Sequence, residues 1–158
     1  MTSSTARKFG HPRTKVAETD HWLVLARPQQ PTFGSLVLVC KEEATAFSDL
    51  SAAAFADLKT AVDGVEALLR GTVAYERINY LMLMMVDPDV HFHVIPRYSQ
   101  PREWSGTTVP DEGWPGPPQL KSAIELGPDQ IGSLRDQRGS ELALISRGRF
   151  FRKLPEPS

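Results

Sequence analysis

The chain has 158 residues, with 18 Lys or Arg against 19 Asp or Glu, which gives a formal net charge of −1 at pH 7. This length suits one domain with a sizeable core, and the balanced charge argues against a nucleic-acid or membrane-surface partner, which usually selects for basic excess. Cys40 is the only cysteine, so an intrachain disulfide and a cysteine-based zinc site are excluded.

Residues 1–16 are polar and basic and contain Gly10 and Pro12, so we expect them to form a flexible leader. They lack the apolar core of a signal peptide. No later run approaches the roughly 18 apolar residues of a membrane span. With a single cysteine and no targeting segment, the sequence predicts a cytoplasmic protein.

Two β-rich runs, 21–25 and 35–39, flank a loop rich in proline and glycine and predict the first hairpin. Ser51 is a suitable N-cap for a helix through Leu69, which Gly71 would end. The apolar stripe of this helix consists of Phe55, Leu58, Val62, Val65 and Leu68.

The run 78–86 is long and mostly apolar, and its Ile, Tyr and Val content together with the break at Asp87-Pro88 favours a strand. A tight turn would lead from it into a second strand over 89–95. The predicted architecture is therefore α+β, with a mostly antiparallel sheet packed against one long helix.

Residues 99–118 are rich in proline and glycine and predict an ordered loop without regular structure. Trp104 and Trp114 should cover a hydrophobic edge or a dimer contact, because exposed tryptophan is costly. A short helix is expected over 128–135, with proline in its first turn. The domain would then span 17–137, followed by a basic, flexible tail at 138–158.

The most informative segment is Asp89-Val90-His91-Phe92-His93-Val94-Ile95-Pro96-Arg97, in which polar and apolar residues alternate. On a strand this alternation places Asp89, His91 and His93 on one face and apolar side chains on the other. Neighbours on that face stand roughly 6.5 to 7 Å apart, close enough to act on one phosphate or one metal ion.

This segment resembles the signature of the histidine-triad (HIT) superfamily of nucleotide hydrolases and transferases, His-x-His-x-His followed by two apolar residues. Asp89 stands where the first histidine would be, and the later positions are in register. The similarity extends upstream to Asn79 and to the proline loop at 28–32, and covers roughly residues 18–100. It implies a HIT-like fold, a small nucleotide substrate, a homodimer and no cofactor or metal.

The resemblance also implies roles for individual residues. His91 would be the nucleophile that forms a covalent nucleotidyl-histidine, its ring held by the main-chain carbonyl of the first triad position, and water would then hydrolyse the intermediate. His93 would bind a non-bridging phosphate oxygen. Asn79 would donate to the same phosphate or its ribose neighbour, and Ser35 and Arg97 are weaker candidates for phosphate contact. A protonated Asp89 could supply a proton to the leaving group.

The expected activity is hydrolysis of, or nucleotidyl transfer from, a small phosphoanhydride or phosphoramidate nucleotide. Two other classes remain open: a catalytically retired nucleotide-binding module, and a metal-binding protein that uses Asp89, His91 and His93 with a further ligand from elsewhere. At single positions, Asp89 could be only a turn residue, Asn79 could make a strand-end hydrogen bond and Arg97 could form a structural ion pair.

Overall fold

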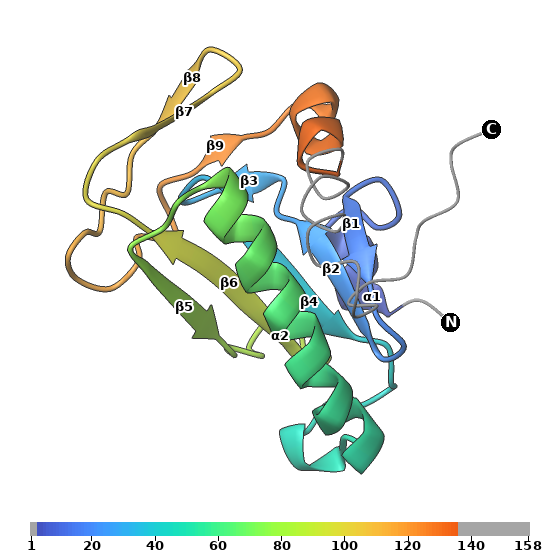
Figure 1. The fold of residues 1–158 in the computed structure, drawn as a ribbon. Coiled ribbons are helices and arrows are strands. Elements are labelled where there is room, and N and C mark those ends of the chain that lie inside the picture. Colours follow the sequence, from blue (N-terminus) through green and yellow to red (C-terminus); the bar gives the residue numbers. More distant parts are fainter. Residues whose placement is uncertain (1–2, 136–158) are drawn as a thin grey trace.

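A computed structural model describes residues 3–135 and consists of a five-stranded antiparallel sheet with one long helix, α2, across one face (Figure 1). The strand order is β1-β2-β4-β6-β5. The bounds are β1 Lys15–Glu18, β2 Trp22–Ala26, β4 Leu36–Cys40, β5 Arg77–Leu81, β6 His91–Arg97 and α2 Ala52–Thr72. The predicted α+β class is confirmed, whereas the expected tail at 138–158 lies outside the described residues.

The predicted first hairpin is formed by β2 and β4, which pair without interruption from Trp22 opposite Cys40 to Ala26 opposite Leu36. Both strands are buried along their whole length because the sheet is covered on both faces. The proline loop between them contains the short strand β3, Gln29–Gln30, which pairs with β9, Ile124–Glu125.

Helix α2 begins where the sequence predicts, with the Ser51 hydroxyl accepting from the backbone N–H of Ala54 at 3.0 Å. It continues to Thr72, beyond the expected end at Leu69, with Gly71 inside the helix. Phe55 was expected in the apolar stripe but is 39% exposed, and it packs against Phe47 of the short 3-10 helix Phe47–Asp49. Val65 and Leu68 of the expected stripe are buried, and the small residues Ala54, Ala61 and Gly64 are buried beside them.

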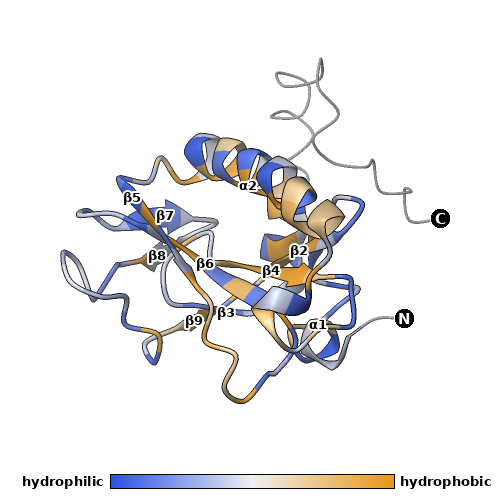
Figure 2. Ribbon diagram, turned by 90° about the horizontal axis from the view of Figure 1, so that it is seen from below, coloured by the Kyte–Doolittle hydropathy of each residue, from blue (hydrophilic) through white to orange (hydrophobic). Residues whose placement is uncertain are grey.

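Residues 3–16 are folded, in contrast to the flexible leader expected over 1–16. Helix α1, Ser4–Lys8, is capped by the Ser3 hydroxyl and buries Thr5 and Ala6. It lies on the sheet face opposite α2 (Figure 2). The sequence pattern did not reveal this helix because its apolar contribution is small: Ala6 and Phe9 complete a cluster with Leu23, Leu25, Val37 and Val39.

The predicted strand over 78–86 is shorter than expected, since β5 ends at Leu81 and residues 82–90 form a connection. The last pair of the β5–β6 ladder joins Leu81 to His93, so the chain beyond Leu81 has no partner on β6. Met85 and Val86 are 85% and 84% exposed, and an apolar loop projects below the sheet in Figure 2.

The segment 99–118, expected to lack regular structure, contains a hairpin of β7, Arg102–Trp104, and β8, Thr107–Val109. Its turn is formed by Ser105 and Gly106, both with positive φ. Trp104 is buried against the Phe33 ring at 4.3 Å between centroids, so it covers a hydrophobic edge as predicted.

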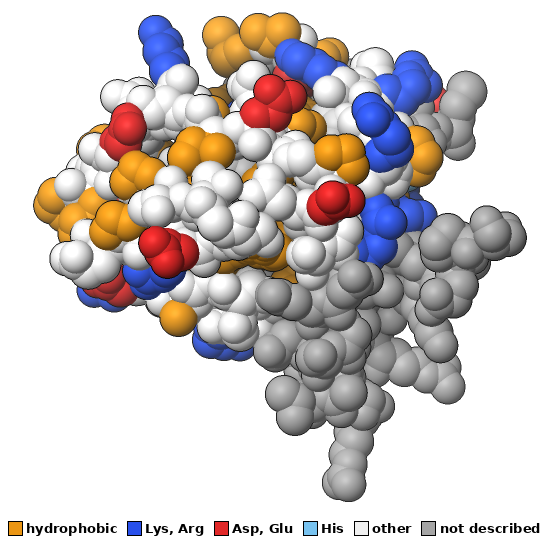
Figure 3. Space-filling model, turned by 90° about the horizontal axis from the view of Figure 1, so that it is seen from above, with side chains coloured by type: hydrophobic (Ala, Val, Ile, Leu, Met, Phe, Trp, Pro, Cys, Tyr) orange, Lys and Arg blue, Asp and Glu red, His pale blue; other side chains and the backbone are white. Residues whose placement is uncertain are grey.

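The predicted short helix is present over 128–135. Charges of both signs are interspersed on the face seen in Figure 3, and no histidine side chain is visible there among the described residues. Within residues 3–135, no helix is long and apolar enough to cross a membrane.

Gly34 is the position where the turn before β4 requires glycine. Its φ is +86°, and an added Cβ would lie 2.6 Å from Cγ2 of Val73 at the end of α2. Gly34→Ala should therefore lower the free energy of unfolding by about 2 to 4 kcal/mol, from left-handed backbone strain and overpacking together. Chemical denaturation measures this.

The matched control is Gly106→Ala, which has a similar φ of +79° but no atom within 4 Å of the added Cβ. It should cost only the backbone strain, about 1 to 2 kcal/mol. Equal losses in the two variants would contradict the close approach of Gly34 to Val73.

Candidate functional site

The alternation of β6 places two imidazoles on the sheet face opposite α2. His93 pairs with Val37 and His91 with Val39 on β4, so all four side chains share that face. The two rings lie 5.0 Å apart between centroids. Phe92, between them in sequence, points the other way and contacts Trp22 in the core. The predicted division of this strand into a histidine face and a core face is confirmed.

The orientation of the His91 ring is set by the main chain. Its Nδ1 lies 2.6 Å from the carbonyl oxygen of Asp89. A carbonyl can only accept, so Nδ1 carries the proton, and in the neutral ring Nε2 keeps its lone pair. This is the tautomer that a nucleophilic imidazole requires.

The Asp89 side chain is turned away from the histidines and binds helix α1. It accepts hydrogen bonds from the Thr5 hydroxyl at 2.8 Å, the Thr5 backbone N–H at 3.2 Å and the Ser4 hydroxyl at 3.2 Å. Burial alone would raise the pKa of this carboxyl, but the hydrogen bonds from Thr5 and Ser4 outweigh it and hold the pKa below its usual value. An ionised carboxylate in this position is not arranged to protonate a leaving group.

Asp89 also lies outside β6, which begins at His91, and this corrects its expected place on the strand face. The three side chains of the predicted set therefore do not converge. Among residues 3–135, no group of three His, Cys, Asp or Glu side chains is placed to hold a metal ion.

His93 is buried beside other potential cations. Burial lowers its pKa to about 4, and the positive charges of Arg27 and His91 act in the same direction. Its Nδ1 is shielded from solvent and has no hydrogen-bond partner among the described residues. His93 is thus a neutral ring at pH 7 with an unsatisfied nitrogen, which a phosphate oxygen or a water could satisfy.

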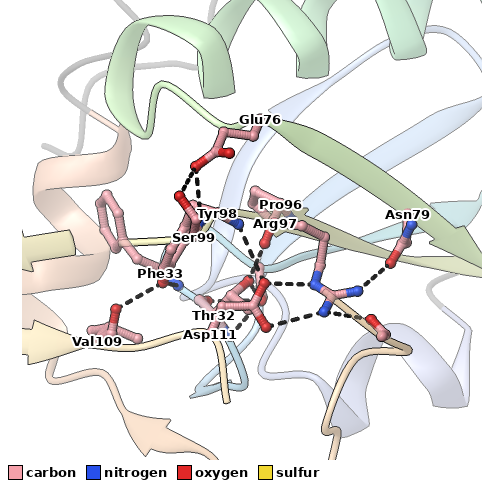
Figure 4. Close-up of polar contacts among 12 residues, drawn as sticks. Thr32, Phe33, Glu76, Asn79, Pro96, Arg97, Tyr98, Ser99, Val109 and Asp111 are labelled. Atoms are coloured by element: carbon pink, nitrogen blue, oxygen red, sulfur yellow. Dashed lines mark hydrogen bonds and ion pairs between the residues drawn. The ribbon is translucent and has the colours of Figure 1, made fainter. Parts of the chain in front are cut away.

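Asn79 and Arg97 are linked to each other on the histidine face (Figure 4). Nη1 of Arg97 donates to the Asn79 side-chain oxygen at 2.8 Å, and its Nε forms a 2.7 Å ion pair with Asp111. Nη2 donates to the Gly116 carbonyl at 2.8 Å. Arg97 is 4% exposed and fully partnered, so the alternative of a structural ion pair describes it better than a phosphate contact.

A cavity of about 550 Å³ lies along β5, lined by Asn79, Leu81, Arg97 and Trp114 among others. Leu81 pairs directly with His93, which places this cavity beside the imidazoles on the same sheet face. Asn79 keeps its amide N–H groups as donors because its oxygen already accepts from Arg97.

Ser35 is fully buried within the proline loop, where its hydroxyl donates to the Thr32 carbonyl at 2.8 Å. It is therefore enclosed and cannot reach a ligand in this conformation, which corrects its expected role in phosphate contact. Its function here is to close the turn before β4.

Two residues at the site escaped the sequence reasoning: Phe9 and Arg27. The Phe9 ring lies 5.6 Å from His93 and 6.3 Å from His91 between centroids, and Cζ of Arg27 lies 6.0 Å from the centre of the same ring. Arg27 follows β2 in the alternation that puts Leu23 and Leu25 on the histidine face. The position of Arg27 at the end of this strand, in register with Leu23 and Leu25, was the sequence signal that could have placed it at the site.

The docking of α1 gives the first prediction for the site. Asp89→Ala removes the acceptor for Thr5 and Ser4 and should increase amide hydrogen exchange across residues 4–9, with about 1 to 2 kcal/mol lost from the free energy of unfolding. Because the folded pKa of Asp89 is lowered, its contribution is present above the unfolded pKa and is lost as the pH falls through the folded value. Unchanged exchange over residues 4–9 would contradict this docking role.

His93 predicts an acid-dependent loss of stability. The unfolded chain takes up a proton at about pH 6.5, whereas the folded ring does so only near pH 4, so unfolding becomes easier as the pH falls between these values. The wild type should lose more free energy of unfolding between pH 7 and pH 4 than His93→Gln does, by roughly 2 to 3 kcal/mol. Urea denaturation at several pH values measures the difference. Parallel curves for the two proteins would contradict a depressed pKa.

Comparison with known proteins places this geometry in context. The HIT domain matches residues 8–100, and no curated protein matches the chain. A histidine triad protein from Bradyrhizobium japonicum has a TM-score of 0.68 at 17% identity, covering 89% of this chain and 96% of that one. One from Sinorhizobium meliloti has a TM-score of 0.69 at 19% identity, covering 90% and 96%. A third, from Marinobacter aquaeolei, has a TM-score of 0.64 at 19% identity, covering 92% of this chain and 97% of that one. At these identities the likeness establishes a shared fold.

Proposed function

Since the chain belongs to the HIT domain family, we propose that it is a nucleotide hydrolase or nucleotidyl transferase acting on a small phosphoanhydride or phosphoramidate nucleotide. The observation that carries the proposal is the 2.6 Å contact between His91 Nδ1 and the Asp89 carbonyl. It leaves Nε2 of His91 as the one ring nitrogen of that residue able to attack phosphorus.

In the proposed reaction, the Nε2 lone pair of His91 forms a bond to phosphorus while the bond to the leaving oxygen or nitrogen breaks. A water molecule, or another acceptor, then attacks the same phosphorus. The bond between phosphorus and Nε2 of His91 then breaks, its electron pair returns to Nε2 and the nucleotide product is released. The Asp89 carbonyl stabilises the positive charge that the ring acquires in the intermediate, as a fixed dipole would.

His93 supports this chemistry as a hydrogen-bonding neighbour of the reacting phosphate. Its ring is adjacent to that of His91 on the same strand. Its Nδ1 has no partner among the described residues and could form a hydrogen bond with a ligand or a water. The partnered Asn79 stands beside the cavity along β5, where it would donate to the phosphate or the ribose.

The retired nucleotide-binding module remains a second candidate, because one observation favours it. His91 is 1% exposed and His93 is 7% exposed, so neither ring is open to a substrate in this conformation. An active enzyme would have to move the segment that covers them, whereas a binding module would not need the nucleophile.

Substitution of the two histidines separates these functions. With dinucleoside polyphosphates, nucleoside phosphoramidates and sugar nucleotides as a substrate panel, His91→Ala should abolish release of nucleoside monophosphate, because the variant lacks the nitrogen proposed to form the covalent intermediate. His93→Ala should retain activity reduced by roughly 10² to 10³, the usual effect of removing one charge-stabilising donor.

Trapping of a phosphorus-labelled nucleotidyl group on His91 during turnover provides the independent measurement. Full activity in His91→Ala would end the proposed mechanism. A wild-type protein that binds nucleotides but releases nothing from the whole panel would establish the retired module.

The family resemblance also leads us to propose a homodimer. Strand β5 is an edge of the sheet, and the adjoining connection exposes Met85 and Val86. Light scattering at micromolar concentration tests the dimer directly, and a monomeric mass would refute it.

A further inference from the structure

We propose that Arg27 is an anion-binding residue of the histidine site, and that the Phe9 ring occupies the place of the bound phosphate group in the ligand-free protein. The inference rests on the proposed function only in taking the ligand to be a phosphate compound. It adds a binding residue, and a side chain that must move, to a site otherwise defined by His91 and His93.

The backbone of Arg27 is held rigidly at the end of β2. Its N–H donates to the Ser35 carbonyl at 3.0 Å, and its carbonyl accepts from the Gln30 side chain at 2.7 Å. Pro28 follows and restricts the chain further. The side chain therefore starts from a fixed point on the histidine face, and a ligand would meet a preorganised cation.

The guanidinium of Arg27, on a partly buried side chain, lacks hydrogen-bond partners among the described residues at two of its nitrogens. Its Nε and Nη1 are shielded from solvent and have no hydrogen-bond partner among the described residues. Arg97 provides the comparison within the same chain, since Asp111, Asn79 and Gly116 accept from its three nitrogens. Shielding the donors of a cation from water without giving them acceptors is destabilising, and a ligand that accepts from them would remove that cost.

Phe9 does not supply the missing partner. Its ring centre is 6.0 Å from Cζ of Arg27, at the outer limit of a cation–π contact, and a ring face cannot replace two hydrogen-bond acceptors. The same ring lies within contact range of His91 and His93. One apolar side chain thus covers all three nitrogen-bearing groups.

The charges around this position favour an anion. The Asp89 carboxylate is turned toward Thr5 and Ser4, and Asp87 is paired with Lys8 at 2.9 Å. No carboxylate among the described residues pairs with Arg27, whose positive charge is felt at His93. A phosphate suits such a site because a guanidinium can donate to it through two parallel hydrogen bonds.

Calorimetric titration of the full chain with inorganic pyrophosphate, AMP and adenosine tests the inference without requiring turnover. Arg27→Gln should weaken binding of pyrophosphate and AMP by about 10- to 100-fold, the usual effect of losing a hydrogen-bonded charge, and should leave adenosine binding unchanged. Arg27→Lys should bind pyrophosphate and AMP with affinities between those of the wild type and Arg27→Gln. Phe9→Ala should tighten pyrophosphate binding, because the ring no longer has to be displaced.

The matched control is Arg70→Gln, which removes the same charge from the exposed surface of α2 and should leave all three affinities unchanged. A second readout is thermal stability: Arg27→Gln should unfold at the same or a higher temperature than the wild type, because a cation with two shielded, unpartnered nitrogens is removed.

Two results would overturn the inference. One is unchanged pyrophosphate binding in Arg27→Gln, and the other is the absence of pyrophosphate and AMP binding in both the wild type and Phe9→Ala. Binding that depends on Arg27 in a protein without any turnover would instead refute the proposed catalysis and leave Arg27 as the anion site.

Discussion

The two-residue period of β6 is the constraint on which the rest of the structure depends. This strand lies between β4 and β5, so its register is fixed from both sides. Phe92 and Val94 enter the core beneath α2, and this anchorage holds His91 and His93 on the opposite face. A shift of one residue would exchange the two sets, which would place the imidazoles in the apolar core under α2 and turn Phe92 toward the face that α1 covers.

The ends of β6 are secured by polar contacts rather than by further burial. At its start, the Asp89 carbonyl and carboxylate serve two different partners, the His91 ring and helix α1. At its end, the Thr32 hydroxyl donates to the Pro96 carbonyl at 2.6 Å, and Arg97 forms its ion pair with Asp111. These contacts connect β6 to the proline loop and to the segment after β8, so the site is supported by elements distant in sequence.

Much of this arrangement is predictable because it follows from local patterns. Alternation identified the histidine face, the Ser51 cap located the start of α2, and proline at 128 indicated the short last helix. The features that sequence reasoning missed depend on tertiary contacts. Helix α1 is stable because it binds the Asp89 carboxylate and packs on the apolar cluster. The hairpin of β7 and β8 forms because Trp104 packs against Phe33. Neither partner is near in sequence.

The carbonyl and the carboxylate of Asp89 have separate roles, and this separation has an evolutionary consequence. The ring of His91 is oriented by a main-chain oxygen, and every amino acid supplies that atom. Selection for ring orientation therefore does not constrain the side chain at this position, which is free to acquire an unrelated role. Here it holds α1, and with it Phe9, against the histidine face. The side chain at position 89 can in this way control access to the histidine face while His91 and the carbonyl that orients its ring stay in place.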